Sequence, residues 1–153
     1  MNIEIERRFL VNESKLILPK NKKTIRQAYL FSNTDQALRV RIIDDKSFIT
    51  YKHRKSKINR FEFEYSIPKD DAEKLIKLSN NYIIHKDRYY ESMGKYMWEI
   101  DVFYDKNKGL VIAEIELDNE NEKIDLPDWI DREISTEKKY FNFNLSKNPF
   151  LDW

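Results

Sequence analysis

Short segments in which hydrophobic and charged side chains alternate recur along most of the chain. The first is residues 3–11, where Glu4, Glu6 and Arg8 alternate with apolar residues. Alternation with a period of two is typical of a β-strand with one polar and one apolar face. The same pattern predicts further strands at residues 24–31, 37–43, 47–52, 60–67, 82–91, 96–104 and 110–117. We therefore expect a mostly antiparallel sheet.

Two other segments have features typical of helices. Residues 68–72 provide a helix start, with aspartates in the capping positions, and this helix is expected to end near Asn80. A second helix is predicted from about 136 to 146. The apolar residues of the C-terminal part, among them Trp129 and Phe141, are expected to pack on the outside of the sheet.

Like charges are doubled at positions i and i+2 in six of the predicted strands. The acidic pairs are Glu4/Glu6, Glu62/Glu64, Glu99/Asp101 and Glu114/Glu116, and the basic pairs are Arg39/Arg41 and Lys86/Arg88. A solvated face explains any one pair, but such a face usually mixes both charges with Ser and Thr within a strand. If helices cover the apolar faces, the ionic faces line a concave interior, as in a sheet that curls into a barrel.

Composition narrows the class of function. The 153 residues are expected to form one domain, residues 1–153, and the net charge of +1 argues against a nucleic-acid or membrane-surface partner. The chain has no cysteine, no apolar run long enough to span a membrane and no signal peptide, so a cytoplasmic location is expected. Its two glycines, Gly94 and Gly109, cannot build a glycine-rich phosphate-binding loop.

A lining of carboxylates and basic side chains suits a particular kind of ligand. Carboxylate oxygens bind hard cations such as Mg²⁺ or Mn²⁺, and Arg and Lys bind phosphate oxygens through charge-assisted hydrogen bonds. A metal-bound polyphosphate satisfies both sets of side chains, which points to phosphoryl or nucleotidyl transfer.

Several motifs, in order along the chain, resemble those of the CYTH superfamily, the triphosphate tunnel metalloenzymes, in its small bacterial type. They are EIERRFL (4–10), QAYL (27–30), LRVR (38–41), KDRY (86–89), WEIDVF (98–103), AEIEL (113–117) and LPDW (126–129) with Arg132 and Glu133. The resemblance implies an α+β fold, an eight-stranded antiparallel β-barrel that forms a tunnel, with helices packed on the outside.

The resemblance also implies roles for individual residues. Metal-side carboxylates would be Glu4, Glu6, Glu62, Asp101, Glu114 and Glu116. Phosphate-binding residues would be Arg8, Arg39, Arg41, Lys52, Lys86 and Arg88. Lys86 and Tyr29 would be catalytic, activating water or protonating the leaving phosphate.

Two positions depart from the family pattern. Arg8 stands where Lys is usual, which keeps the charge but excludes proton transfer. Ala28 stands where Gly is usual and is expected to narrow the pocket beside Tyr29.

The resemblance favours metal-dependent hydrolysis of a triphosphate, with inorganic tripolyphosphate as the first substrate to test. The alternatives are a nucleoside or thiamine triphosphatase, a class IV-like adenylate cyclase, or a polyphosphate-binding module without turnover. A homodimer is also plausible.

Overall fold

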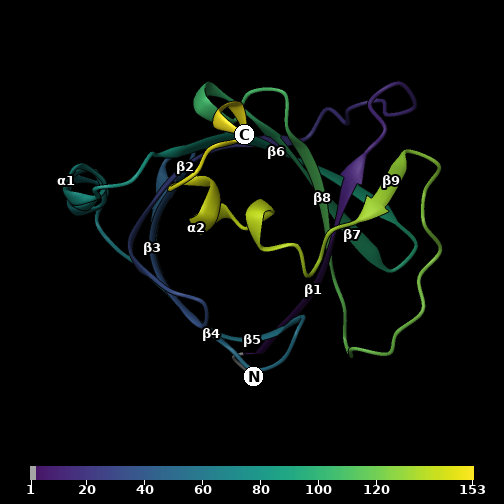
Figure 1. The fold of residues 1–153 in the computed structure, drawn as a ribbon, viewed down its shortest axis with the longest axis horizontal. Helices are drawn as coiled ribbons and strands as arrows, with labels where there is room; N and C mark the ends of the chain where they lie inside the picture. The colour runs from purple at the N-terminus through teal and green to yellow at the C-terminus, as the bar shows by residue number, and fades with distance from the viewer. Residues whose placement is uncertain (1–2) are drawn as a thin grey trace.

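The protein is described here by a computed structural model of residues 3–153, in which the strands form a closed ring (Figure 1). The strands are β1 (Ile3–Val11), β2 (Lys22–Ser32), β3 (Gln36–Ile43), β4 (Lys46–Arg54), β5 (Asn59–Ser66), β6 (Ile84–Met93), β7 (Tyr96–Phe103), β8 (Val111–Glu116) and β9 (Ile130–Glu133). They lie in the order β5-β4-β3-β2-β6-β7-β8-β1-β9, and a further pairing of β5 with β1 closes an eight-stranded antiparallel barrel. The predicted barrel is confirmed.

β1 closes the barrel because its two halves pair with different strands. Residues 3–5 pair with β5, and residues 6–10 pair with β8. Its C-terminal end also pairs with β9, at Phe9 and Val11, with a register shift between these two residues. β9 was not predicted, because its four residues, IDRE, are too few to show an alternating pattern.

Much of the apolar core lies between the outer face of the barrel and the segments that cover it, because the apolar faces of the strands point outward. In one cluster the ring of Phe9 lies 5.7 Å from that of Trp98, which lies 5.4 Å from that of Trp129. Trp129 lies in the long connection between β8 and β9 and packs against Trp98 in this outer cluster. The prediction that it packs on the outside of the sheet is therefore confirmed.

The helix α1 (Lys69–Leu78) covers the outside of β2, β3 and β4, at the left of Figure 1. Its Ala72 and Ile76 pack against Val40 and Ile42. Ala28 belongs to the same outer cluster, so the expectation that its methyl group narrows the interior pocket is wrong: the side chain points away from that pocket. Within residues 3–153, no helix is long and apolar enough to cross a membrane.

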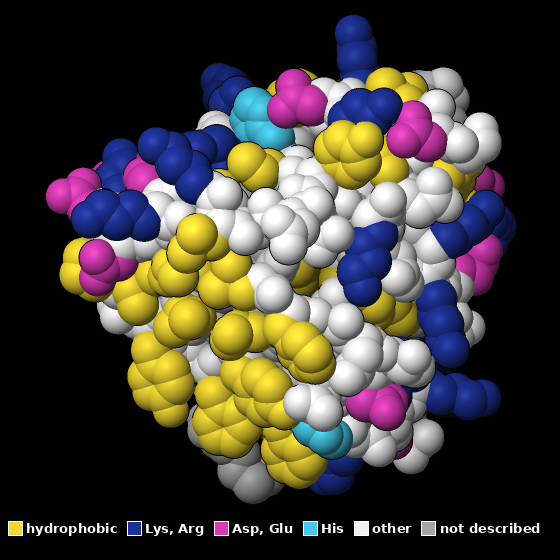
Figure 2. Space-filling view, turned by 60° about the vertical axis from the view of Figure 1, so that its left-hand side comes forward, with side chains coloured by type: hydrophobic (Ala, Val, Ile, Leu, Met, Phe, Trp, Pro, Cys, Tyr) yellow, Lys and Arg dark blue, Asp and Glu magenta, His cyan; other side chains and the backbone are white. Residues whose placement is uncertain are grey.

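Below α1 the outer surface is largely uncovered, and hydrophobic side chains gather there (Figure 2). The register sets Leu38, Tyr51 and Phe63 side by side across β3, β4 and β5. Phe61 and Tyr65, on the same face of β5, are exposed.

The C-terminal segment does not form the predicted helix over 136–146. It contains a 3-10 turn, η2 (Lys138–Tyr140), and the four-residue α2 (Asn142–Leu145), because Phe141 between them has an extended backbone. Two further turns are η1 (Asp105–Asn107) and η3 (Phe150–Asp152). In Figure 1, η2 and α2 lie across the ring of strands. Leu145 is fully buried against the apolar interior residues Ile84 and Phe103, so this segment covers one end of the barrel.

Candidate active site

The charged strand faces surround a cavity of about 240 Å³ inside the barrel. Its lining carboxylates are Glu4, Glu6, Asp35, Glu62, Glu64, Glu99, Glu114 and Glu116, and its cations are Arg8, Arg39, Arg41, Lys52, Arg54, Arg60, Lys86 and Arg88. Tyr29 lines the cavity as well. All the predicted phosphate-binding residues, and all the predicted metal-side residues except Asp101, are therefore brought together.

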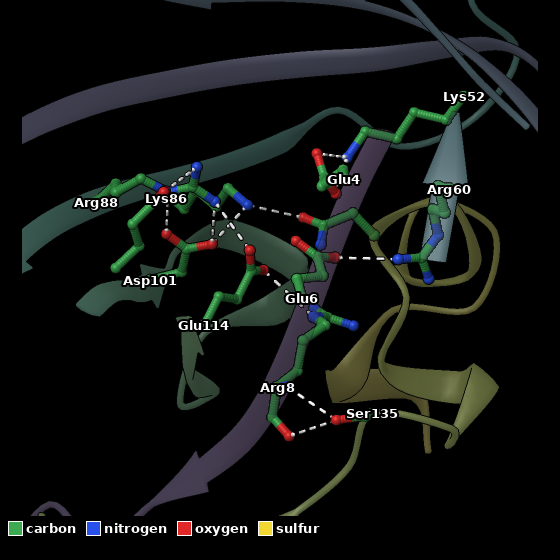
Figure 3. A network of polar contacts seen from close by, with 12 residues as sticks. Glu4, Glu6, Arg8, Lys52, Arg60, Lys86, Arg88, Asp101, Glu114 and Ser135 are labelled. Atoms are coloured by element: carbon green, nitrogen blue, oxygen red, sulfur yellow. Dashed lines mark hydrogen bonds and ion pairs between the residues drawn. The ribbon is translucent and has the colours of Figure 1, made fainter. Parts of the chain in front are cut away.

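Strand register places opposite charges next to each other on neighbouring strands. Arg8 on β1 lies directly opposite Glu114 on β8, and the Arg8 Nε donates a hydrogen bond of 3.2 Å to Oε1 of Glu114 (Figure 3). Arg8 is only 3% exposed, yet its Nη2 is buried without a hydrogen-bond partner in the described chain. The Nε of Arg39 is likewise buried without a hydrogen-bond partner among the described residues. Buried donors without partners are costly, so these two nitrogens are ready to bind an anion.

The cations themselves crowd one another. Burial, together with the nearby charges of Arg39 and Arg88, lowers the pKa of the Arg41 guanidinium to about 10. A phosphate group bound among these three arginines would relieve this repulsion.

Asp101 lies beneath the cavity lining and is fully buried. One of its oxygens accepts hydrogen bonds from Lys86 Nζ at 2.7 Å and Arg88 Nη2 at 2.9 Å, and the other accepts one from Arg88 Nε at 2.7 Å (Figure 3). Although burial alone would raise the pKa of Asp101, the charges of Arg88 and Lys86 outweigh it and hold that pKa well below its usual range. The geometry makes Asp101 an anchor for two cations.

Lys86 lies at the floor of the cavity with only 1% of its surface exposed. Its Nζ also donates a hydrogen bond of 3.0 Å to Oδ1 of Asn142. Burial lowers the pKa of the Lys86 amine to about 7, against the opposing effect of Asp101. A buried amine of this kind can exchange a proton near neutral pH.

A second group of carboxylates lies around Lys52. The Lys52 Nζ contacts Glu4 at 2.9 Å and Glu62 at 3.2 Å, and Arg60 contacts Glu6 at 3.3 Å. Glu116 has no ion-pair partner within residues 3–153. Burial and the nearby charges of Glu4, Glu62, Glu6 and Glu99 raise the pKa of Glu116. Hard oxygen donors that repel one another are chemically suited to a divalent cation.

The carboxylates are not preassembled around a metal-sized point. Across residues 3–153, no three His, Asp or Glu side chains form a cluster that could hold a metal ion. Instead, most of these carboxylates are engaged by Lys52, Arg60, Arg8 or Arg88. Binding a metal with its ligand would therefore require an exchange of ion-pair partners.

Several residues that line the cavity were not among the predicted metal-side or phosphate-binding residues. Arg60 has the same strand parity as Glu62, and Glu99 the same as Asp101, so the period of two was a sufficient signal for both. Asn142 gave no such signal. Phe141 was expected outside the sheet, and that prediction is wrong: its ring lies in the cavity wall, 5.8 Å from the guanidinium carbon of Arg8 and 5.4 Å from that of Arg60. The extended backbone at Phe141 turns the chain inward over the barrel end.

These features define a class of protein: a closed antiparallel β-barrel with an ionic interior suited to a small, highly charged ligand. The model of the CYTH domain family matches residues 2–148, and the chain belongs to this family. The predicted resemblance is therefore confirmed.

Comparison with individual proteins adds detail to the family assignment. Over 154 residues the chain is 40% identical to an inorganic triphosphatase of Acetivibrio thermocellus, covering 100% of this chain and 99% of that protein. The solved structure of the inorganic triphosphatase NE1496 has a TM-score of 0.68 at 29% identity, covering 94% of this chain and 93% of that one. The PH1012 protein from Pyrococcus horikoshii has a TM-score of 0.59 at 23% identity, over 77% and 80% of the chains, and shows the shared fold alone.

Proposed function

We propose that the protein hydrolyses inorganic tripolyphosphate in a reaction that depends on a divalent metal ion, Mg²⁺ or Mn²⁺. The observation that carries the proposal is an ionic cavity inside a closed barrel. In it, two buried arginine nitrogens have no hydrogen-bond partner among residues 3–153, and they lie in the same cavity as a group of mutually repelling carboxylates. The names of the triphosphatase relatives support the same reaction.

The cavity volume favours an inorganic substrate over a nucleotide. About 240 Å³ is less than the roughly 300–1,000 Å³ of pockets that enclose drug-sized ligands. Charged side chains make up most of the polar lining, which suits phosphate groups.

In this proposal, Arg8, Arg39, Arg41 and Arg88 hold the phosphate oxygens, because guanidinium groups bind them bidentately. Lys52 would bind phosphate after releasing Glu4 and Glu62. Asp101 contributes by fixing Lys86 and Arg88, so we assign it to this support instead of to the metal.

The carboxylates that would hold the metal are Glu4, Glu6, Glu62, Glu114 and Glu116. When bound, a divalent ion neutralises charge on the phosphate chain and polarises the phosphorus for attack by water. Their oxygen donors fit Mg²⁺ and Mn²⁺ better than softer metals.

Lys86 and Tyr29 would carry the proton transfers. An amine with a pKa near 7 takes a proton from an attacking water or returns one to the leaving phosphate at neutral pH. Tyr29 lines the same cavity, and its hydroxyl accepts a hydrogen bond of 3.4 Å from Gln27.

The first test is phosphate release from tripolyphosphate, ATP and thiamine triphosphate, each with Mg²⁺, Mn²⁺ or EDTA. We expect metal-dependent release that is fastest with tripolyphosphate and absent with EDTA. Faster release from ATP or thiamine triphosphate, or formation of a cyclic nucleotide, would assign one of the alternative activities. Binding of tripolyphosphate without release from any substrate would leave a polyphosphate-binding module.

A further inference from the structure

We propose that Asn142 is a positioning residue, which orients the Lys86 amine and, through Gln27, the Arg41 guanidinium toward the phosphate site. This inference rests on the proposed triphosphatase function. It assigns a task in the reaction to α2, whose four residues lie far from the charged strands in sequence.

The first observation is how the Lys86 amine is held. A charged lysine has three N–H donors and no acceptor. One donor goes to Asp101 Oδ2 at 2.7 Å, and a second goes to Asn142 Oδ1 at 3.0 Å. With two directions fixed, the third N–H is constrained, and Lys86 is a cavity-lining residue. Asn142 therefore restricts where this amine can meet a phosphate or a water.

The second observation is that the same Asn142 oxygen accepts from a second residue. Gln27, which is fully buried, donates from Nε2 to Asn142 Oδ1 at 3.2 Å. At its other end, Gln27 Oε1 accepts a hydrogen bond of 2.7 Å from Arg41 Nε. With Nε committed to Gln27, the two Nη nitrogens of Arg41 are the part of the fork left for phosphate.

The third observation is that Asn142 is itself held in place from both sides. Before it in sequence, the ring of Phe141 lies within 6 Å of the guanidinium carbons of Arg8, Arg54 and Arg60. After it, Leu145 is fully buried in the apolar end of the barrel. These contacts give the amide a fixed platform, as a positioning group requires.

The charged environment of Lys86 does not make Asn142 redundant. Four charged groups act on the amine electrostatically: Asp101 on β7, Glu114 on β8, Arg88 on β6 and Arg41 on β3. Of these four groups, only Asp101 accepts a hydrogen bond from Lys86 Nζ within residues 3–153. Without Asn142, the amine would keep only the hydrogen bond to Asp101 and could rotate about its direction.

Two substitutions of Asn142 separate positioning from packing. Asn142→Leu keeps the approximate size but removes the acceptor, and Asn142→Asp keeps an oxygen in the same place for both donors. We expect Asn142→Leu to lower kcat about 10- to 100-fold, through the loss of the hydrogen bond to the charged Lys86. KM should rise by a smaller factor, because Gln27, which holds Arg41, loses its bond to Asn142 as well. Asn142→Asp should raise KM, because its charge opposes that of the phosphate, and should move the pH profile of kcat to higher pH, because a second carboxylate beside Lys86 favours the protonated amine.

The matched control is Asn148→Leu, the same substitution at an exposed position of the same segment, which should leave kcat and KM unchanged. Circular dichroism at the assay temperature checks that each variant is folded. An Asn142→Leu enzyme that is folded and has wild-type kcat would overturn the inference.

A readout without substrate keeps this inference separate from the proposed function. In ¹³C-resolved NMR of the unliganded protein, an anchored Lys86 should give two distinct ε-methylene proton signals, in wild type and in Asn142→Asp. These signals should merge in Asn142→Leu. Distinct signals in a wild-type protein that releases no phosphate would refute the triphosphatase and leave the anchoring intact, whereas signals unaffected by Asn142→Leu would refute the anchoring itself.

Discussion

At the scale of single residues, the guanidinium of Arg8 shows why the departure from the usual Lys matters. Its Nε bonds Glu114 while its Nη2 stays buried without a partner in the described chain, and its carbon lies 5.8 Å from the ring of Phe141. An ammonium group is a single point charge and cannot make these separate contacts from one planar fork. Arg8 thus connects Glu114, one of the proposed metal-binding carboxylates, to the segment that covers the barrel end.

The carboxylate of Glu114 gives the sharpest residue-scale prediction. Glu114→Gln should reduce turnover of tripolyphosphate at least 100-fold, because the amide removes a negative charge from the proposed metal side. The loss in free energy of unfolding should be only about 1–2 kcal/mol, since Gln keeps an oxygen to accept from Arg8. Phosphate release and urea denaturation measure the two quantities.

The control for this substitution is Glu73→Gln on α1, where the carboxylate forms an ion pair with Arg26 on the outside of the barrel. It should leave turnover unchanged. If Glu114→Gln stays active and unfolds at much lower urea, the acidic pair serves stability and the proposed metal site is wrong.

At the scale of elements, α1 is a cover for the outer apolar face and has no part in the cavity. Ile76→Ala removes a fully covered side chain from the cluster with Val40 and Ile42. We expect a loss of about 2–4 kcal/mol in the free energy of unfolding, with kcat unchanged below the melting temperature. Lys74→Ala, on the exposed side of the same helix, should change stability by less than about 0.5 kcal/mol. A fall in kcat for folded Ile76→Ala would mean that α1 is coupled to the site.

How far the elements were predictable depends on whether their pattern was local. The eight barrel strands and the ionic interior were predictable, because a period of two places Glu4, Glu6 and Arg8 on one face regardless of distant contacts. The inward turn at Phe141 was not, because it depends on contacts with Arg8 and Arg60 that are more than 80 residues away in sequence. For the same reason, the site contribution of Asn142 could only emerge from the folded chain.

At the scale of the whole molecule, the cavity lining balances its charges. The described residues that line it include eight carboxylates and eight Lys or Arg side chains. A bare polyphosphate would therefore add uncompensated negative charge, while a polyphosphate with divalent cations adds much less. In the proposed function, this balance would give the metal a role in binding as well as in the chemistry.

Metal removal tests that role directly. Calorimetric titration with tripolyphosphate should give at least about tenfold weaker binding in EDTA than with Mg²⁺. Each carboxylate that loses its Lys or Arg partner to the phosphate would, without the metal, have no cation to replace it. A matched titration with Glu73→Gln should reproduce the wild-type ratio. Equal affinity with and without metal would show that the basic side chains alone bind the phosphate chain.

The balanced lining also has a consequence for how quickly substrate arrives. With a net charge of +1 over the whole chain, the molecule projects little electric field beyond a Debye length, about 8 Å at physiological ionic strength. Enzymes with a cleft of one sign gain association rate from such a field and lose it in salt. For the proposed polyanionic substrate we therefore expect little long-range guidance, and its selection would begin once the ligand is inside and ion-pair partners can be exchanged.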